Sequence, residues 1–345
     1  MKVMILASGS GGHVYPAVAF YRYLLNHGHD GIFIGIKGCF EERLLDLKDK
    51  NCVFLEIEKK SSYYLKHPFK YKEVKKALLE NKETIKNFDC ILAFGGIMSY
   101  VGLVASSLFK KKLFLHEQNA RLGDGNLFAG IKARRIFTVF DKTIMPFYLK
   151  RKVTQSGNPR SLEARAYYKS MRSNHPRILF FAGSLGSKTL IKSIKDIANT
   201  LIEKYDITVI TGTNYYEYFK KDSDPRIEVI NYANNILQLM SGMDVVIMRA
   251  GATSISEIMA LEINAILVPS PYVKHDHQRE NARALENKKI VNVLEEKEVT
   301  VKKVGQLIEE IINNYEERIN KKIRMRKLQN LYASNTIIEV MKSEI

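Results

Sequence analysis

Cysteine is scarce in this chain. The three cysteines, Cys39, Cys52 and Cys90, are isolated, and no CxxC pair occurs. This spacing fits neither a disulfide framework nor a cysteine-based zinc site, so we expect buried free thiols.

Long apolar runs are also missing. No stretch approaches the ~20 apolar residues that span a bilayer, and the apolar run after Lys2 stops at Ala7, short of a secretory signal. We therefore expect a cytoplasmic protein.

Acidic residues are in deficit. The 37 Asp and Glu residues against 54 Lys and Arg give a formal charge of +17 at pH 7. This excess favours polyanionic partners, namely nucleic acid, an acidic membrane surface or phosphorylated substrates. Lysine outnumbers arginine and no nucleic-acid-binding motif is visible, so we expect no nucleic acid partner.

Short β-rich apolar runs alternate with longer helical patterns along the 345 residues, a length that suits two α/β domains. The runs of the first half are 2–7, 31–35, 52–57, 89–94, 112–116 and 135–140. Those of the second half are 177–182, 207–211, 226–230, 244–248, 265–268 and 289–293. Because parallel strands need helical crossovers and are buried on both faces, the alternation predicts two doubly wound, parallel-sheet α/β domains.

The turn at 157–159 is the best boundary between the two halves, with the polar stretch 168–176 as the alternative. We predict an N-terminal domain over 1–159 and a C-terminal domain over 160–330. A final helical segment, 331–345, is expected to pack back toward the first domain. Two such domains would face each other across a cleft.

A glycine loop follows the first apolar run, in ASGSGGHVYPA. Loops at the carboxyl ends of parallel strands let backbone amides approach a ligand, and the following helix N-terminus favours anions. The dinucleotide fingerprint fails, however, because Val14 replaces the third glycine after Gly9 and Gly11, and no Walker lysine follows. We therefore expect no NAD or ATP cofactor. A tight turn that holds no ligand is the alternative.

A second glycine loop occurs at the matching place of the second half, in FFAGSLGSKTL. Gly183, Ser184 and Gly186 follow a predicted strand, and the hydroxyls of Ser187 and Thr189 lie near the start of the next helix. One loop could hold a diphosphate and the other an uncharged or sugar ligand.

The segment 249–258, RAGATSISEI, ends a strand and begins a helix. Thr253 or Ser254 can cap that helix, which would place Glu257 in its first turn. In that position Glu257 either complements the helix dipole or accepts hydrogen bonds from a ribose diol.

Six segments together resemble the MurG family, in order and spacing over nearly the whole chain. They are GSGGHVYPA, HEQN at 116–119, GNP at 157–159, AGSLG at 182–186, RAGATSISEI at 249–258 and HDHQRENA at 275–282. HEQN is the most discriminating of them. The resemblance implies a GT-B-fold glycosyltransferase that moves GlcNAc from UDP-GlcNAc to lipid I, making lipid II for peptidoglycan. It also implies a peripheral protein on the cytoplasmic face of the cell membrane.

The resemblance also implies roles for matching residues. Ser10, Gly11 and Gly12 would lie near the donor sugar and the acceptor diphosphate, and Asn119 would contact the GlcNAc portion.

In the second half, the resemblance assigns the donor nucleotide. Ser184 would bind the donor phosphate beside Ala252, Glu257 would bind the ribose hydroxyls, and the backbone around Ala233 would meet uracil.

Gln278, with His277 beside it, would reach the donor sugar.

Two segments depart from the family pattern. Ser161 stands where the family commonly has an arginine, with Arg160 next to it, and GGIMSY at 95–100 differs from the usual GGYVSG-like form.

Inverting transfer needs a base for the acceptor hydroxyl and dipolar groups for the departing UDP. His13 is the predicted base, because a histidine pKa of about 6.5 suits proton transfer at neutral pH. Substrate orientation or helix capping by His13 is the alternative. His116, at a strand end, has the pattern of a positioning group.

No metal is expected to take part. Asp222 and Asp224 form an Asp-x-Asp pair, but Pro225 follows and the pair lies before a strand, which is typical of a solvated turn. The adjacent residues 275–277 rarely converge on one ion.

The segment 59–80 interleaves lysines with aromatic and aliphatic residues, a composition suited to an anionic membrane surface. A solvated loop and charged helix face is the alternative.

Three other functions stay open for the protein as a whole. They are a GT-B transferase for another acceptor, a nucleotide-sugar epimerase, and a basic binding protein with an inactive donor site.

Overall fold

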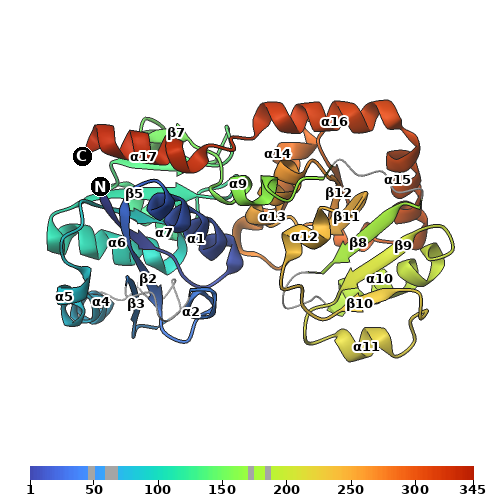
Figure 1. Ribbon diagram of the computed structural model, residues 1–345, viewed down its shortest axis with the longest axis horizontal. Helices are drawn as coiled ribbons and strands as arrows, with labels where there is room; N and C mark the ends of the chain where they lie inside the picture. Colours follow the sequence, from blue (N-terminus) through green and yellow to red (C-terminus); the bar gives the residue numbers. More distant parts are fainter. Residues whose placement is uncertain (46–50, 59–68, 170–174, 183–187) are drawn as a thin grey trace. The chain divides into compact units, whose positions relative to one another are not determined.

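The computed structural model describes residues 1–45, 51–58, 69–169, 175–182 and 188–345. By its internal contacts the chain divides into two α/β units. Unit 1 comprises Met1–Leu162 and Asn330–Ile345, and unit 2 comprises Glu163–Gln329. Figure 1 shows a parallel sheet covered by helices in each unit. The predicted fold class, two doubly wound parallel-sheet domains, is confirmed.

Unit 1 contains a seven-stranded sheet of order β3-β2-β1-β4-β5-β6-β7, in which every pairing is parallel. Its strands are β1 Lys2–Leu6, β2 Asp30–Ile36, β3 Cys52–Leu55, β4 Cys90–Ala93, β5 Lys112–Glu117, β6 Arg135–Thr138 and β7 Val153–Gln155. Six of them lie within or beside the predicted runs. Sequence analysis missed β7, whose three residues are too short and too exposed to form an apolar run.

Two apolar layers enclose this sheet because side chains alternate along each strand. Met4 and Leu6 join one buried cluster, and Val3 and Ile5 join the other. The helices around the sheet are α1 Gly11–Asn26, α2 Phe40–Leu44, α4 Phe69–Glu80, α5 Lys82–Ile85, α6 Gly96–Phe109, α7 Asp124–Gly130, α8 Phe147–Lys150 and α17 Ala333–Glu344. Burial on both faces explains why the central strands are apolar throughout.

The final helix α17 belongs to unit 1, although the chain reaches it from unit 2. Ile337, Ile338 and Met341 are buried in the same apolar cluster as α1. At the far end of α17, Glu344 pairs with both Arg134 and Arg135. The apolar stripe and this ion pair fix the helix on the sheet.

Unit 2 has a six-stranded parallel sheet of order β10-β9-β8-β11-β12-β13. Its strands are β8 Arg177–Phe181, β9 Asp206–Ile210, β10 Glu228–Ile230, β11 Val245–Met248, β12 Asn264–Leu267 and β13 Asn292–Val293. The helices are α10 Lys188–Leu201, α11 Tyr216–Lys220, α12 Ile236–Met240, α13 Ala252–Leu261, α14 His277–Glu286, α15 Val301–Asn313 and α16 Tyr315–Leu328, with short 3-10 turns η1 Lys274–Asp276 and η2 Glu296–Glu298. The short helix α9, Arg160–Arg165, carries the chain from unit 1 into unit 2.

Candidate functional site

The first glycine loop connects β1 to α1 in unit 1. Gly9 has φ +96°, a conformation that L residues rarely adopt, so the loop needs glycine there. Ser10 is the N-cap residue of α1, and its carbonyl accepts hydrogen bonds from the N–H groups of His13 and Val14. Gly11 and Gly12 are the first two residues of α1, at the positive end of the helix dipole. The predicted residues Ser10, Gly11 and Gly12 thus lie on an accessible helix N-terminus.

Glu41, in α2, holds this loop in place through hydrogen bonds to its buried carboxylate. Its side chain is fully buried, and its two carboxylate oxygens accept hydrogen bonds from Gly9 N (3.2 Å) and Ile36 N (2.9 Å). Gly35 leaves room for it, since a Cβ there would lie 2.7 Å from Glu41 Cγ. Sequence analysis missed this residue.

His13 lies against a second glycine turn, at the start of α6. Gly95 and Gly96 both have positive φ, +97° and +58°. A Cβ on Gly95 would come within 3.0 Å of His13 Nε2. The two glycines therefore allow the half-buried imidazole to sit over the N-terminus of α6, a relationship that sequence analysis did not identify.

The HEQN segment forms a hydrogen-bond network around the buried carboxylate of Glu117. One oxygen accepts from the backbone and side-chain N–H groups of Asn119, both at 3.0 Å. The other accepts from Gly123 N (2.8 Å) and Asn126 Nδ2 (2.9 Å). Ser99, in α6, donates to Asn126 Oδ1 at 2.6 Å. Asn119 is thereby held in one orientation, by partners that sequence analysis missed in Ser99 and Asn126.

His116 has a different role from His13. It is fully buried, and burial lowers its pKa to about 4, so the ring is neutral at physiological pH. Nε2–H donates to Gly157 O at 3.0 Å, which leaves Nδ1 to accept from Gln118 Nε2 at 3.0 Å. Phe94 stacks on the ring with centroids 5.0 Å apart. His116 thus ties the end of β5 to the GNP turn.

Arg160 lies beside the first glycine loop. Its guanidinium carbon is 4.9 Å from the centre of the Tyr15 ring, and Tyr15 packs edge-on against Phe40. A Cβ on Gly11 would lie 3.0 Å from the same tyrosine ring. Asn158 fixes the backbone of Arg160 through a 2.9 Å hydrogen bond to its N–H. The arginine shifted by one position is therefore anchored next to the loop.

In unit 2, helix α13 begins earlier than predicted. Gly251 is the N-cap residue in extended conformation and Ala252 is the first helical residue, so Thr253 and Ser254 lie inside the helix. Glu257 then falls in the second turn, and the first turn contains no acidic residue. The prediction of a first-turn carboxylate was wrong, because the glycine starts the helix without a side-chain cap. Glu257 is buried in this helix.

The β11–α13 loop is fixed by Arg249. Its guanidinium pairs with Glu296 at 2.6 Å, and both side chains are about nine-tenths buried. The same guanidinium donates to the carbonyls of Val268 and Pro269, both at 3.3 Å. The loop before Ala252 is thus tied to the loop after β12.

Helix α14 carries the predicted donor-sugar residues His277 and Gln278. Gln278 Oε1 accepts from Ser270 N at 2.9 Å, which fixes this side chain across the loop after β12. Asn281, fully buried, donates to Ala250 O at 3.2 Å and so connects α14 to the loop before α13. Ala252, His277 and Gln278 consequently belong to one region of unit 2.

Two other predicted donor residues are less defined by contacts. Ala233 lies half-buried in the turn between β10 and α12. Ser184 lies outside the described residues.

Both carboxylates of the Asp-x-Asp pair contact basic side chains of the protein. Asp224 accepts hydrogen bonds from the Arg226 side chain and backbone, and the side-chain bond leads in lowering its pKa to about 2. Asp222 faces Lys195 at 3.5 Å. Among the described residues, no three His, Cys, Asp or Glu side chains are grouped to hold a metal.

In the described parts of the chain, no helix is long and apolar enough to cross a membrane.

Two family models match the chain. The glycosyltransferase family 28 N-terminal domain matches residues 3–138, and the glycosyltransferase family 28 C-terminal domain matches residues 177–336. With two parallel-sheet units, these matches define a glycosyltransferase of the GT-B fold.

Similar proteins narrow this class. A UDP-N-acetylglucosamine--N-acetylmuramyl-(pentapeptide) pyrophosphoryl-undecaprenol N-acetylglucosamine transferase from Bacillus pumilus is 30% identical over 350 residues, covering 95% of this chain and 94% of the relative. A transferase of the same name from Natranaerobius thermophilus is 29% identical and covers 100% of both chains. The chain belongs to the MurG family, which confirms the resemblance read from its motifs.

Solved structures share the fold. MurG from Acinetobacter baumannii superposes with a TM-score of 0.77 at 23% identity, over 99% of each chain. UDP-GlcNAc 2-epimerase from Neisseria meningitidis superposes with a TM-score of 0.66 at 15% identity, over 99% of this chain and 100% of that one.

Proposed function

We propose that this protein is an inverting glycosyltransferase that moves GlcNAc from UDP-GlcNAc to the muramyl 4-hydroxyl of lipid I, forming lipid II for peptidoglycan. The observation that carries the proposal is the Glu117 network, which holds Asn119 in one orientation within a chain of this family. Four N–H donors compensate the burial of this carboxylate, and a fully satisfied network of this kind holds the side chains in it rigidly.

Unit 2 binds the donor in this proposal. The N-terminus of α13 at Ala252 offers backbone N–H groups and a positive dipole end to the diphosphate, together with Ser184. Glu257 binds the ribose hydroxyls, and the backbone around Ala233 meets uracil. His277 and Gln278 reach the sugar.

Unit 1 binds the acceptor. Backbone N–H groups at Ser10, Gly11 and Gly12 contact the acceptor diphosphate, and Asn119 contacts the sugar being transferred. A helix N-terminus preceded by a glycine loop suits a diphosphate without needing a metal.

The reaction is an in-line displacement. The acceptor oxygen forms a bond to the anomeric carbon while the bond from that carbon to the UDP oxygen breaks, and the acceptor proton passes to His13. The Gly95–Gly96 turn supports this role because it holds the imidazole in place. The negative charge that develops on UDP is stabilised by the N-terminal N–H groups of α13.

A transfer assay tests the proposal directly. Purified protein, UDP-GlcNAc and a short-chain lipid I analogue are incubated with EDTA, and both UDP release and product mass are followed. Addition of one GlcNAc to the analogue supports transfer without a metal. UDP release without that product favours another acceptor, and epimerised UDP-sugar with no acceptor gain favours an epimerase. No turnover after magnesium is restored, together with no UDP binding, favours a binding protein.

The donor-site assignment has its own test. Glu257→Ala is expected to weaken UDP-GlcNAc binding, and unchanged affinity removes Glu257 from the ribose role.

The assignment of the base is tested separately. His13→Ala is expected to lower turnover far more than donor affinity, and near-normal turnover rejects it as the base.

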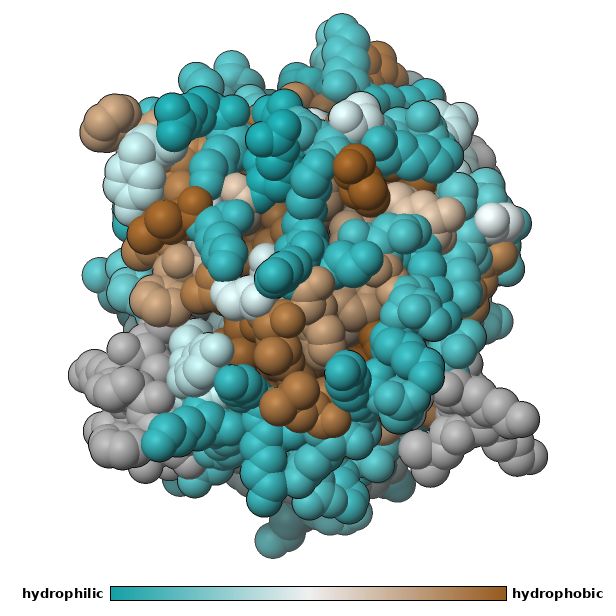
Figure 2. All heavy atoms as spheres, turned by 90° about the vertical axis from the view of Figure 1, so that its left-hand side faces the viewer, coloured by the Kyte–Doolittle hydropathy of each residue, from teal (hydrophilic) through white to brown (hydrophobic). Residues whose placement is uncertain are grey.

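The lipid-linked acceptor also requires a membrane, and we place the protein peripherally on the cytoplasmic face of an anionic membrane. In α4, exposed Tyr71 and Leu79 share a helix with Lys72, Lys75 and Lys76. Figure 2 shows apolar side chains gathered on a face bordered by hydrophilic ones. The adjoining residues 59–68 lie outside the described parts of the chain. Neutralising the three α4 lysines is expected to reduce binding to anionic vesicles.

A further inference from the structure

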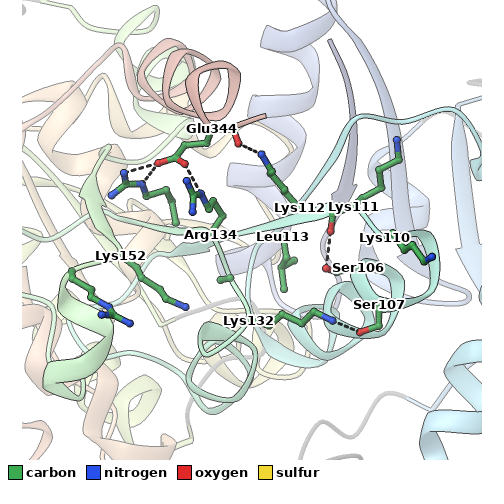
Figure 3. A pocket seen from close by; sticks show the side chains of 13 residues that line it. Ser106, Ser107, Lys110, Lys111, Lys112, Leu113, Lys132, Arg134, Lys152 and Glu344 are labelled. Carbon is green, nitrogen blue, oxygen red and sulfur yellow. Dashed lines mark hydrogen bonds and ion pairs between the residues drawn. The ribbon is translucent and has the colours of Figure 1, made fainter.

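The last two helices of the chain, α16 and α17, differ in how their apolar residues are covered. The apolar side chains of α17 are buried in the core of unit 1. Glu344 pairs the end of this helix with Arg134 and Arg135, as the dashed lines in Figure 3 mark. The apolar face of α17 is therefore covered within the protein itself.

Helix α16, on the surface of unit 2, leaves a row of apolar side chains exposed. Tyr315, Ile319 and Ile323 are 52%, 39% and 41% exposed. Their spacing of four residues places them one above another along the helix, and Lys327 continues the row by one more turn. Met325, on the other side of α16, is fully buried. The helix is thus amphipathic, and part of its apolar surface faces outward.

The two ends of α16 carry opposite charges. Glu316 and Glu317 lie in its first turn, and Arg326 and Lys327 lie in its last turn. This placement complements the helix dipole. It also makes the exposed row complementary to itself. A second copy laid antiparallel across the first brings each acidic end to a basic end, whereas a parallel copy brings like charges together.

The row fixes the register of such an antiparallel pair. With the two-fold axis midway between them, Ile319 lies opposite Ile323 of the second copy, and Tyr315 lies opposite Lys327. A two-fold axis repeats each contact in the other direction, so four isoleucine side chains form the apolar centre. At both ends, the Lys327 ammonium group meets the ring of Tyr315 and the neighbouring carboxylate of Glu316.

We propose that α16 is a self-association surface, on which a second copy of this chain docks antiparallel to form a two-fold dimer. Each helix has 14 residues and is about 21 Å long. A contact limited to two such helices buries less than the about 1,200 Å² at which stable interfaces begin. The dimer is therefore transient, with a dissociation constant of about 10–100 µM.

This surface lies away from the proposed donor residues of unit 2. Arg326 binds Glu262, which directly follows the last residue of α13, whereas Ala252 is the first residue of that helix. Lys321 Nζ donates to the side chain of Asn292, the first residue of β13. Both contacts lie at the edge of the sheet where its strands begin, and the donor loops follow the strand ends. Dimerisation thus leaves the N-terminus of α13 accessible.

The first test removes the apolar centre. Sedimentation velocity measures association of the full-length protein between about 5 and 300 µM, a range that brackets the expected dissociation constant. The α16 variant replaces Ile319 and Ile323 by Gln. The control replaces Ile131 and Ile144 by Gln, two exposed isoleucines of unit 1. We expect the dissociation constant to rise about tenfold or more in the α16 variant and to stay within about twofold in the control. Thermal melting checks that both variants fold.

The second test exchanges charges and checks the antiparallel register. Glu316→Lys and Lys327→Glu should each weaken association about fivefold or more, because like charges then meet. The double variant, Glu316→Lys with Lys327→Glu, should return to within about threefold of the parent protein. These residues are separated by about 16 Å along one helix. A direct contact within one chain therefore cannot explain the rescue.

Three results would overturn the proposal. They are a parent protein that stays monomeric over the whole concentration range, association that the isoleucine substitutions leave unchanged, and a double charge variant that is not rescued. A monomeric parent whose binding to phosphatidylglycerol vesicles is weakened in the α16 variant would assign this face to a membrane instead. Transfer to a soluble acceptor analogue is measured for every variant and is expected to be unchanged, so failure of the proposed function is detected separately.

Discussion

The carboxylate of Glu41 accepts a hydrogen bond from the backbone N–H of Gly9 at 3.2 Å, and so links a buried acid in α2 to the glycine loop. Its other oxygen accepts from Ile36 N at the end of β2. Gly9 has φ +96°, and its N–H is oriented by this contact rather than by the helix that follows. Glu41 therefore fixes the glycine loop to the end of β2 through Gly9.

Glu41→Ala is expected to lower the free energy of unfolding by about 2–4 kcal/mol, because two buried N–H groups lose their acceptor. The value of kcat/KM should fall too, since the loop loses its support. Glu41→Gln keeps one acceptor oxygen, so its free energy of unfolding and its kcat/KM should lie between those of the parent protein and those of Glu41→Ala. Urea unfolding and transfer kinetics measure both effects. Glu42→Ala, which removes a contact to Gly38 outside the loop, is the control. Loop support is contradicted if Glu42→Ala lowers kcat/KM as much as Glu41→Ala.

The buried imidazole of His116 makes stability depend on pH. Its pKa is about 4 in the folded protein against 6.5 when unperturbed, because burial disfavours the charged form. Between these values the unfolded chain binds the extra proton, so stability falls as the pH is lowered from 6.5 toward 4. The loss approaches about 3 kcal/mol at the acid end of this window.

Urea unfolding at several pH values measures this slope. His116→Gln should flatten the dependence, whereas His27→Gln, at an exposed position, should leave it unchanged. A slope that persists in His116→Gln assigns the acid sensitivity to other groups.

Glu262 is expected to be a major stabilising residue of unit 2. Its fully buried carboxylate binds Arg165 in α9 at 2.5 Å and both Nε and Nη2 of Arg326 in α16 at 2.7 Å. Glu262→Ala leaves two guanidinium groups unpaired and should lower the free energy of unfolding by about 2–3 kcal/mol, less than for a fully buried pair because both arginines are partly exposed.

Glu262→Gly separates charge from backbone strain. Residue 262 has φ +55°, so glycine relieves strain that alanine keeps, and this variant should be about 1 kcal/mol more stable than Glu262→Ala. Urea unfolding measures both. Equal stabilities would show that the backbone contributes nothing at this position.

The Gly95 turn provides a test of His13 without changing the histidine. A Cβ in Gly95→Ala would meet His13 Nε2 at 3.0 Å and displace the ring, so kcat should fall about tenfold or more while UDP-GlcNAc affinity is retained. Gly28→Ala is a matched control, since Gly28 also has positive φ but a Cβ there would contact nothing within 4 Å. If both variants lose activity equally, backbone strain rather than His13 placement is responsible.

The fold could be predicted because most strands are apolar over their whole length. Burial on both faces of a parallel sheet requires this, and β1 and β4 show it plainly. Strand β7 escaped because its three residues are partly exposed. The start of α13 was misplaced because Gly251 caps it with backbone geometry alone.

The sequence identified candidate site residues where they are adjacent in the chain, as in the glycine loop and HEQN, and their roles stay predictions. Contacts between residues far apart in the chain were not predictable. Glu41 reaches Gly9, and Ser99 reaches Asn126, only after the sheet has assembled. No local pattern marks such a residue, because its partner is set by the tertiary structure.

Arg160 is expected to contact the acceptor phosphates. The guanidinium lies over the Tyr15 ring beside the glycine loop, although Arg160 is one position away from the arginine of the family pattern. Arg160→Ala should raise the KM for the lipid I analogue about tenfold with little change in UDP-GlcNAc affinity. Arg160→Lys should restore little, because an ammonium group lacks the planar surface that stacks on the ring. Tyr15→Phe keeps the ring and should behave like the parent protein, whereas Tyr15→Leu should resemble Arg160→Ala. Steady-state kinetics with varied acceptor measures these effects, and a normal acceptor KM in Arg160→Ala would limit Arg160 to a structural role.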